Sequence, residues 1–524
     1  MAWWGWGDPD LARPLSPEMS SLVREALGVR RDGPPVPSLE GLDLPESRMP
    51  PEVAEHLSQI VGPNQLSAER EPRVGHLRGK STSDLLRLRL GDLSDAPDLV
   101  VMPGSHQEIL DVLELCTAER IAVVPFGGGT SVVGGLAPRR GDSFQSMLAL
   151  DLQRLNRLTG LDEESRLATL EPGLRGPQAE ARLGERGYTL GHFPQSFEYA
   201  SVGGFAATRS SGQASAGYGR FDERVVGLTV ATPRGTVELG QAPRSAAGPD
   251  LRQLFLGSEG TLGVLTSLRV EISPAPAVRR YEGWRLPDFA AATAVVRRFA
   301  QDGPAPTIVR VSDEVETALN LARPELAGTS GGAGCLLITG WEGSATEVQE
   351  RAEAVRQMLG QFGAEPVPEA GPDWAAGRFS APYLRDALLA AGALVETLET
   401  ACFWSGLPRI YAAVRQALVD SLSGLGTPPV VLCHISHIYR SGASLYFTVA
   451  CAQNDDPVRQ WQQAKTAASD AILTAGGTIS HHHGVGTEHR YWYHRQLGPV
   501  MLDALRAVKR ELDPAGILNP GVLV

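Results

Sequence analysis

The chain has 524 residues, of which 42% are hydrophobic and 21% charged, and its net charge is −12 at pH 7. This length exceeds one ordinary hydrophobic core, so the composition predicts a soluble globular protein of two or more lobes. The acidic balance argues against a nucleic-acid binder, because counterion release requires a dense basic surface.

The cysteines and the N-terminus indicate the compartment. The five cysteines are far apart and form no CxxC pair, which is typical of a reduced cytoplasmic protein and not of a disulfide scaffold or a zinc finger. The opening MAWWGWGDPD lacks the basic and apolar regions of a signal peptide. The longest near-apolar run, residues 387–395, is far shorter than the roughly 20 residues of a membrane span. We therefore expect a cytoplasmic protein that does not cross a membrane.

Four segments follow one another along the chain. Residues 1–94 are predicted to form an N-terminal helical arm, since proline and acidic residues surround the helix-like piece SPEMSSLVREALGV. Residues 95–275 begin with a strand, an amphipathic helix and a second strand that enters a glycine loop, and they end at the proline-rich joint SPAPAVRR. Residues 276–475 alternate strand and helix signals, which suggests a sheet with helices on one face. Residues 476–524 form a C-terminal segment.

The glycine loop PFGGGTSVVGG, residues 125–135, follows the apolar strand IAVV. Consecutive glycines let main-chain N–H groups converge on an anion without obstruction by side chains. The loop is neither a P-loop nor the dinucleotide pattern GxGxxG. Taken alone, it is compatible with phosphate binding or with an ordinary tight turn.

Three further stretches favour a flavin site. SVGGFAATRSSG, GSEGTLG before a strand, and the terminal ELDPAGILNPG occur in an order and spacing that resemble the flavin-binding family of vanillyl-alcohol oxidase type. The resemblance implies FAD as the cofactor, held noncovalently because the loop contains no histidine. It assigns cofactor contacts to Pro125, Phe126, Gly127, Gly128, Gly129, Thr130, Ser131, Gln195, Ser196, Ser201, Gly203, Gly204, Thr208, Arg209, Ser210, Ser211, Glu259, Gly260, Thr261, Leu262, Gly263, Val264 and Leu265.

More of the chain is similar to the alkyldihydroxyacetonephosphate synthase family within that group. The stretches WWGWG, GHFPQSFEYASVGG, VATPRGTVE, LFLGSEGTLGV and SHHHGVG carry this resemblance. It implies an α+β fold: a two-lobed FAD-binding domain of vanillyl-alcohol oxidase (PCMH) type, and a cap domain whose antiparallel sheet is covered by helices. The C-terminal segment is then expected to return to the FAD site.

The same resemblance implies a reaction and its residues. Family members exchange the acyl chain of acyl-dihydroxyacetone phosphate for a fatty alcohol, through a flavin N5 adduct and without net redox, which forms the ether bond of ether lipids. Catalytic roles fall on Tyr446, Arg310, His481, His482 and His483, and substrate-binding roles on Arg385 and Thr397, which stands where the family has serine. A tyrosine serves as the base only if cations or donors lower its pKa of about 10.

Each of these residues also has an ordinary structural explanation. Arg310 lies in the strand-like TIVRVSD and is compatible with a buried salt bridge, while Tyr446 lies in an alternating strand and is compatible with core packing. Arg385 belongs to an amphipathic helix, where a surface arginine is the default. The run 387–395 is expected to form an apolar Ala/Leu helix, which suits an alkyl tunnel or simple core packing.

The histidine run 481–483 is predicted to be the end of a strand, where alternate side chains face opposite sides. On that basis His481 and His483 share a face, His482 points elsewhere and orients its neighbours, and one metal cannot bind all three. His434 and His437, three residues apart on a predicted strand, also point to opposite faces. We therefore predict no metal site.

Two alternatives remain open at this stage. An FAD-dependent D-2-hydroxy-acid dehydrogenase or oxidase shares the scaffold, and a flavin-bearing binding module without catalysis is conceivable. His434 and His437 replace the arginine and the glutamine of the animal synthase, which bears on substrate choice. The expected partners are acyl-dihydroxyacetone phosphate, a long-chain fatty alcohol, a second copy in a homodimer, and the periphery of a membrane.

Overall fold

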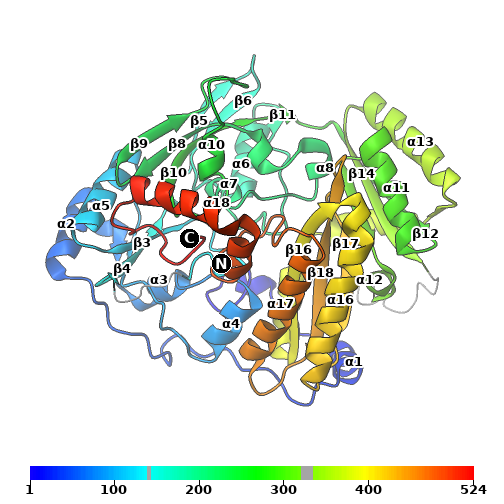
Figure 1. Ribbon diagram of the computed structural model, residues 1–524, viewed down its shortest axis with the longest axis horizontal. Helices are drawn as coiled ribbons and strands as arrows, with labels where there is room; N and C mark the ends of the chain where they lie inside the picture. The colour runs from blue at the N-terminus through cyan, green and yellow to red at the C-terminus, as the bar shows by residue number, and fades with distance from the viewer. Residues whose placement is uncertain (138–142, 320–333) are drawn as a thin grey trace.

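The computed structural model describes residues 1–137, 143–319 and 334–524. Two lobes lie side by side, and the C-terminal helix α18 (Arg490–Leu512) begins near their border and runs over the first lobe (Figure 1). The first lobe carries a four-stranded and a five-stranded sheet, and the second carries one seven-stranded sheet. This arrangement confirms the predicted α+β class with a flavin-type first lobe and a cap.

The four-stranded sheet has the order β1-β2-β4-β3 and forms the outer part of the first lobe. β2 and β3 pair with β4 in parallel, while β1 pairs with β2 antiparallel. Its strands read as continuous apolar runs because both faces are covered, and the cluster around them includes α5 and α2. The elements are β1 (Leu66–Ser67), β2 (Leu99–Val101), α5 (His106–Ala118), β3 (Ala122–Phe126) and β4 (Met147–Asp151).

The five-stranded sheet is antiparallel, with the order β5-β6-β10-β8-β9. A separate two-stranded ladder joins β7 and β11. Short helices that begin at small residues lie against this sheet and carry the predicted cofactor segments. The elements are β5 (Leu158–Asp162), β6 (Leu167–Leu170), α6 (Gly176–Gly184), β7 (Tyr188–Thr189), α7 (Val202–Ala207), α8 (Ser215–Tyr218), α9 (Phe221–Arg224), β8 (Val225–Thr232), β9 (Gly235–Leu239), α10 (Arg252–Phe255), β10 (Val264–Glu271) and β11 (Ser273–Pro274).

The seven-stranded sheet of the second lobe is antiparallel throughout, with the order β15-β12-β14-β13-β17-β18-β16. Its strands alternate, so that Val309, Val311, Leu445 and Phe447 enter the helix-covered core while the residues between them face the other way. The elements are β12 (Val278–Leu286), α11 (Phe289–Asp302), β13 (Ile308–Ser312), α12 (Glu314–Leu319), β14 (Cys335–Gly343), α13 (Ala345–Gln361), β15 (Glu365–Pro366), β16 (Ala393–Phe403), η5 (Trp404–Gly406), α16 (Leu407–Gly424), β17 (Val430–Ile435), β18 (Gly442–Ala452) and α17 (Pro457–Thr474).

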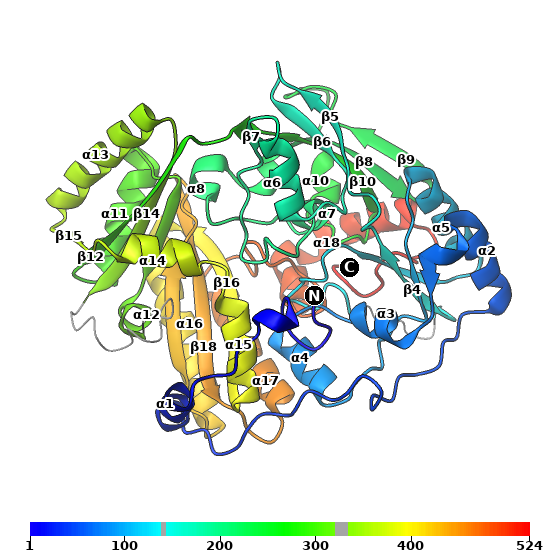
Figure 2. The same ribbon diagram turned by 180° about the vertical axis from the view of Figure 1, so that it is seen from behind.

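Two further helices, α14 (Ala370–Gly377) and α15 (Ala381–Ala390), lie on the face of this sheet that α16 and α17 leave free (Figure 2). The apolar run 387–395 is therefore not one helix. α15 ends at Ala390, Gly392 takes a φ of 88°, and β16 begins at Ala393. The expectation of a continuous apolar helix around 387–395 is wrong, because this left-handed glycine ends the helix.

The N-terminal 94 residues contact both lobes. α2 packs its apolar face into the core of the first lobe, whereas Trp6 donates its main-chain N–H to Asp386 of α15 at 2.5 Å. The domain limits at 94, 275 and 475 stay predictions. The elements of this part are η1 (Pro9–Leu11), α1 (Pro17–Leu27), α2 (Pro51–Val61), η2 (Pro63–Gln65), α3 (Arg70–Gly75) and α4 (Thr82–Arg89).

The C-terminal segment runs back to the first lobe. α18 is kinked at Gly498, beyond it Leu518 bridges to Val123 of β3, and Asn519 donates from Nδ2 to the carbonyls of Gly135 and Glu259. The chain end is thereby part of the cofactor lobe. Among the described helices, none is long and apolar enough to cross a membrane.

Candidate active site

Tyr446 lies on β18, on the face of the sheet opposite the helix-covered core. The β16–β18 register places Tyr446 directly across from Glu399, so that both side chains occupy the same face. The phenol ring stacks on His434, with ring centroids 4.7 Å apart, and lies 6.0 Å from His482 and 5.6 Å from His483. Core packing is therefore not the role of Tyr446.

The histidine run is not the end of a strand. Residues 481–483 bend around Glu399, whose side chain is buried, and their three main-chain N–H groups donate to its carboxylate at 2.6, 3.1 and 3.0 Å. Ser480 adds its hydroxyl at 2.7 Å. The predicted alternation fails because the carboxylate curls the backbone, and the expectation that His482 faces away is wrong.

The three imidazoles point in different directions around this bend. His481 meets Arg220 and Tyr439, His482 lies between His481 and Tyr446, and His483 makes an edge contact with Tyr446. His437 joins them, with its ring centroid 4.9 Å from His481 and its Nδ1 3.2 Å from the Ser211 hydroxyl. The site is thus assembled from both lobes and the C-terminal segment.

Arg310 forms an ion pair with Glu316, as its position in a strand-like segment suggested. Its Nη2 donates to Glu316 at 2.5 Å, and both Nη atoms lie within 3.2 Å of the His434 ring nitrogens. Burial raises the pKa of Glu316, but Arg310 and His434 together outweigh burial and hold that pKa at about 2. Since His434 also stacks on Tyr446, Arg310 acts behind the tyrosine, and its predicted catalytic role stays a prediction.

The titration state of the site differs from the expectation. Burial raises the pKa of Tyr446 to about 12, and hydrogen bonding with Thr397 offsets it only in part. The anticipated net lowering by cations is wrong for this geometry, because burial, with the nearby Glu396 and Glu399, outweighs the lowering by Arg310. Burial also lowers the pKa of His481, His482 and His483 to about 3, so these rings are neutral at pH 7.

Arg385 and Thr397 lie on different elements beside this face. Arg385 is not a surface arginine: its guanidinium donates to Asp386 and, at 2.5 Å, to the Lys80 carbonyl. Lys80 in turn is buried and donates to the carbonyls of Ala2 and Trp3. Thr397, on β16, donates its main-chain N–H to the adjacent Glu396. Their substrate-binding roles remain predictions.

The glycines of the loop 125–135 lie too close to the segment around Tyr199 and Ser201 to carry side chains. A Cβ on Gly128 would lie 2.0 Å from the Tyr199 carbonyl, and one on Gly127 would lie 2.3 Å from the Ser201 hydroxyl. Within the part of the chain that the structure describes, the main-chain N–H groups of residues 127–131 have no protein acceptor. A row of free N–H groups on glycines fits a pyrophosphate, which only a cradle without side chains admits.

The remaining predicted cofactor residues divide into two groups. Several use their side chains within the protein: Ser201 and Thr208 bind the Gly204 main chain, Arg209 donates to Leu256 and Gln253, Ser210 binds His192, and Thr261 binds Ser258. Gln195 instead leaves its buried Nε2 without a described acceptor. The side chains of the first group are therefore positioned by contacts within the protein.

Glu259 connects the cofactor lobe with the histidine run. Its carboxylate accepts the N–H groups of Val485 at 3.1 Å and Gly486 at 3.0 Å, directly after the histidines. Burial raises the pKa of Glu259 from 4.5 to about 7. The sequence resemblance implied that Glu259 contacts the flavin. In the structure its side chain accepts hydrogen bonds from the loop that follows the histidine run.

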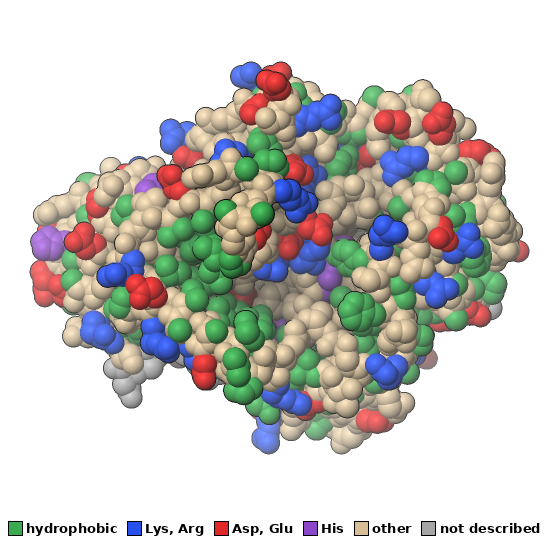
Figure 3. Space-filling model, turned by 45° about the horizontal axis from the view of Figure 1, so that its top comes forward, with side chains coloured by type: hydrophobic (Ala, Val, Ile, Leu, Met, Phe, Trp, Pro, Cys, Tyr) green, Lys and Arg blue, Asp and Glu red, His purple; other side chains and the backbone are tan. Residues whose placement is uncertain are grey.

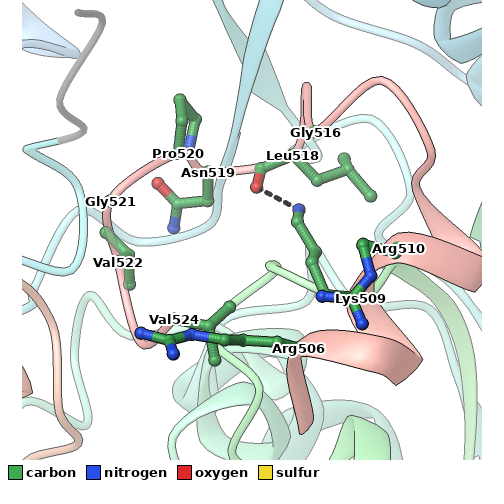
Figure 4. A pocket seen from close by; sticks show the side chains of 10 residues that line it. All are labelled: Arg506, Lys509, Arg510, Gly516, Leu518, Asn519, Pro520, Gly521, Val522 and Val524. Carbon is green, nitrogen blue, oxygen red and sulfur yellow. Dashed lines mark hydrogen bonds between the residues drawn. The ribbon is translucent and has the colours of Figure 1, made fainter. Parts of the chain in front are cut away.

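A hollow near the centre of one face contains basic and histidine side chains, with hydrophobic side chains at its rim (Figure 3). A separate cavity of about 260 Å³ lies between α18 and the chain end, where Lys509 donates to Leu518 (Figure 4). An apolar cavity of about 220 Å³ lies between α10 and α18. Neither of these two cavities contains a residue of the histidine cluster.

Three imidazoles in the cluster are close enough to share an ion. Within the described residues, His437, His481 and His482 offer ring nitrogens that all lie within 4.8 Å of one another. However, Nη1 of Arg220 lies 3.0 Å from His481 Nε2, and a guanidinium there opposes a second cation. The absence of a metal stays a prediction.

Sequence reasoning missed the side chains that hold the site. Glu399, Arg220, Tyr439 and Glu316 were not singled out, although Glu399 lies two residues after Thr397, which the family resemblance did assign. Each acts on a residue far along the chain, and no local pattern signals such a contact.

Comparisons with known proteins agree with this geometry. Residues 97–240 match the family model of the FAD binding domain, and residues 275–523 match that of the C-terminal domain of FAD linked oxidases. The alkyldihydroxyacetonephosphate synthase of Dictyostelium discoideum is 32% identical to this chain, and the match covers 100% of this chain and 93% of the relative. The synthase of Trypanosoma brucei brucei is 31% identical, and the match covers 100% of this chain and 92% of the relative. A solved structure of alkyldihydroxyacetonephosphate synthase, 30% identical, superposes with a TM-score of 0.84 over 99% of this chain and 98% of its own.

The FAD-binding lobe and the oxidase-type second lobe define an FAD-dependent enzyme of the FAD linked oxidase class. Within that class, the chain belongs to the alkyldihydroxyacetonephosphate synthase family. The sequence-based predictions of the cofactor and the family are thereby confirmed. Noncovalent attachment stays a prediction, supported by the absence of histidine from residues 125–135.

Proposed function

We propose that the chain is an alkylglycerone-phosphate synthase, which exchanges the acyl chain of acyl-dihydroxyacetone phosphate for a long-chain fatty alcohol. The observation that carries this proposal is the set of three histidines bent around the buried Glu399, with Tyr446 beside their rings and Arg310 behind Tyr446. The chain is similar to synthases from end to end. FAD supplies the electron-rich centre at which the two chains are exchanged without net redox.

Different residues of the chain would bind the cofactor, bind the substrate and transfer the proton. The main-chain N–H groups of residues 127–131 would hold the pyrophosphate of FAD. Arg385 and Thr397 bind the phosphate end of the substrate, for which a planar guanidinium is well suited. Tyr446 handles the C1 proton of the substrate, with the neutral His482 and His483 rings close enough to share it.

The raised pKa of Tyr446 refines its role. A phenol with a pKa of about 12 is protonated at pH 7, so it accepts a proton only while passing on its own. The neutral His483 ring beside it offers an acceptor nitrogen, and Arg310 with Glu316 fixes the position of the stacked His434. We infer that Tyr446 and the histidines act as one unit, so that removal of any member affects the same step.

The remaining partners follow from the fatty substrates. Long acyl and alkyl chains imply contact with a lipid surface at the membrane periphery from the cytoplasmic side, and the family resemblance favours a homodimer. His434 and His437 lie at the polar end of the site and bear on the choice of substrate.

An exchange assay tests the proposal directly. With palmitoyl-dihydroxyacetone phosphate and labelled hexadecanol, we expect one fatty acid released for each alcohol incorporated, without lasting bleaching of the flavin. Bleaching by D-lactate under anaerobic conditions, without exchange, would instead establish a D-2-hydroxy-acid dehydrogenase. Tyr446→Phe should abolish turnover and retain FAD; retained turnover would exclude the tyrosine as the proton-handling group.

A further inference from the structure

Arg220 precedes α9 and is fixed in direction by three protein acceptors. Its Nε donates to Asp222 at 3.0 Å, its Nη2 to the Arg209 carbonyl at 2.8 Å, and its Nη1 to the His481 carbonyl at 2.8 Å. Only 14% of the side chain is exposed. The guanidinium therefore holds one orientation toward the histidine run.

The same Nη1 lies 3.0 Å from Nε2 of His481, and the Tyr439 hydroxyl lies 2.6 Å from that nitrogen. A guanidinium is always protonated and has no acceptor atom. An N–H on His481 Nε2 would consequently point at another N–H. Nε2 must carry the lone pair, and the single proton of the neutral ring must be on Nδ1.

This proton determines the next ring. Nδ1 of His481 lies 3.0 Å from Nδ1 of His482, so the His481 N–H donates and His482 Nδ1 accepts. The proton of neutral His482 is then on Nε2. The nearest oxygen of Glu399 is 3.7 Å from His482 Nδ1, which is too long for a hydrogen bond that would draw a proton to that nitrogen.

We propose that Arg220 is a positioning residue that acts through His481 to fix His482 as the Nε2–H tautomer. His482 then presents a hydrogen-bond donor within the site that contains Tyr446. The significance of this donor rests on the proposed function: it serves the substrate oxygen that gains negative charge as the C1 proton is removed. A donor placed in advance at a developing negative charge stabilises the transition state.

The opposite relay is chemically distinct. There His482 Nδ1–H would donate to His481, and His481 Nε2–H would donate to Tyr439, leaving His482 Nε2 as an acceptor. In that arrangement the N–H on His481 Nε2 also lies against the Arg220 guanidinium, so the hydrogen bond from Arg220 Nη1 to His481 Nε2 at 3.0 Å is lost. The two relays therefore differ in which nitrogen of each ring carries hydrogen.

Nitrogen NMR on the flavin-loaded protein with ¹⁵N-labelled histidine rings distinguishes the relays at pH 7. The signals of His482 are assigned by their loss in His482→Gln. We expect His481 protonated at Nδ1 and His482 at Nε2. Protonation of His482 at Nδ1 would overturn the proposal. This measurement requires no substrate, so failure of the exchange assay would count against the proposed function alone.

Two substitutions test the action of Arg220, with a third as control. Arg220→Met should abolish the fixed tautomer and lower kcat at least tenfold with little change in KM, and Arg220→Lys should restore both. Arg224→Met removes another buried arginine nearby, which donates to the Glu271 and Tyr218 carbonyls, and should lower stability without altering the tautomer. An unchanged His482 tautomer in Arg220→Met would also overturn the proposal.

Discussion

Two buried glutamates hold the same loop from opposite lobes, and they differ in charge state. Glu399 on β16 accepts three main-chain N–H groups and the Ser480 hydroxyl, and its pKa is held well below the usual range although burial acts in the other direction. Glu259 in the cofactor lobe accepts only two N–H groups, so burial dominates and its pKa rises to about 7.

The difference shows what a buried carboxylate requires to remain charged. Neighbouring imidazoles and three or four donors offset the desolvation of Glu399, whereas two donors do not offset that of Glu259. Glu399 therefore shapes the histidine run 481–483 as an anion at neutral pH. Glu259 joins the loop to the cofactor lobe by a contact that depends on pH.

Substitution Glu399→Gln should have the largest effect. The amide replaces an acceptor with a donor facing three N–H groups, so we expect about 3 kcal/mol of destabilisation and, since the histidines lose their anchor, at least about a hundredfold loss of exchange. Thermal unfolding and the exchange assay measure the two effects. The folded pKa is lowered, so the stabilisation by Glu399 is present above pH 4.5 and is lost as the pH falls through the folded pKa.

A suitable control for Glu399→Gln is Glu342→Gln. Glu342 is also buried, on β14, and accepts from the Tyr218 hydroxyl at 2.8 Å. Among the described residues it forms no hydrogen bond or ion pair with a histidine, so the variant should lose stability but keep exchange. Equal losses of activity in both variants would mean that Glu399 has no special role.

Gly486→Ala tests the attachment of the loop to the cofactor lobe. A Cβ at this position would lie 1.9 Å from the Val133 carbonyl, at a φ of 54°. We expect a loss of about 2–4 kcal/mol, from the left-handed conformation and the overlap with main chain, together with a lower flavin content. Gly516→Ala, at a φ of 69° with open space around it, should cost only about 1 kcal/mol. Similar costs for the two variants would show that the overlap is relieved easily.

Glu259→Gln should change how stability depends on pH. Because the folded pKa is about 7 against 4.5, the folded protein keeps a proton that the unfolded chain has released between these values. Stability therefore falls as the pH rises through this window, by about 1.4 kcal/mol per unit. The glutamine variant, always neutral, should lack this decline in unfolding measurements between pH 5 and pH 8. A decline as steep as that of the parent protein would assign it to another group.

The two lobes also differ in how far the sequence predicts them. The strand that enters the glycine loop was predictable because its signals lie in consecutive residues, while the role of GGGTS as an anion site stays a prediction. The strands around Arg310 and Tyr446 were also predictable from local patterns. By contrast, the bend of His481 to His483 depends on Glu399, 82 to 84 residues away, and the tautomers depend on Arg220, 261 residues away. The period-two rule failed there because a buried anion, and not a strand ladder, satisfies the main-chain N–H groups.

Ser480→Ala should have the smallest effect on the difference between Glu399 and Glu259, since it removes one of the four donors to Glu399. We expect a loss of about 1–2 kcal/mol, the usual contribution of a hydrogen bond to a charged group, and a small rise in the pKa of Glu399 toward that of Glu259. Ser94→Ala removes an exposed hydroxyl that donates to Asp92 at the same 2.7 Å and should cost less than about 0.5 kcal/mol. The acid limb of the stability curve checks the shift, because Ser480→Ala should begin to unfold at a higher pH than the parent. If the two serine variants behave alike, the three main-chain N–H groups alone keep Glu399 charged, and the donor count that separates it from Glu259 is three against two.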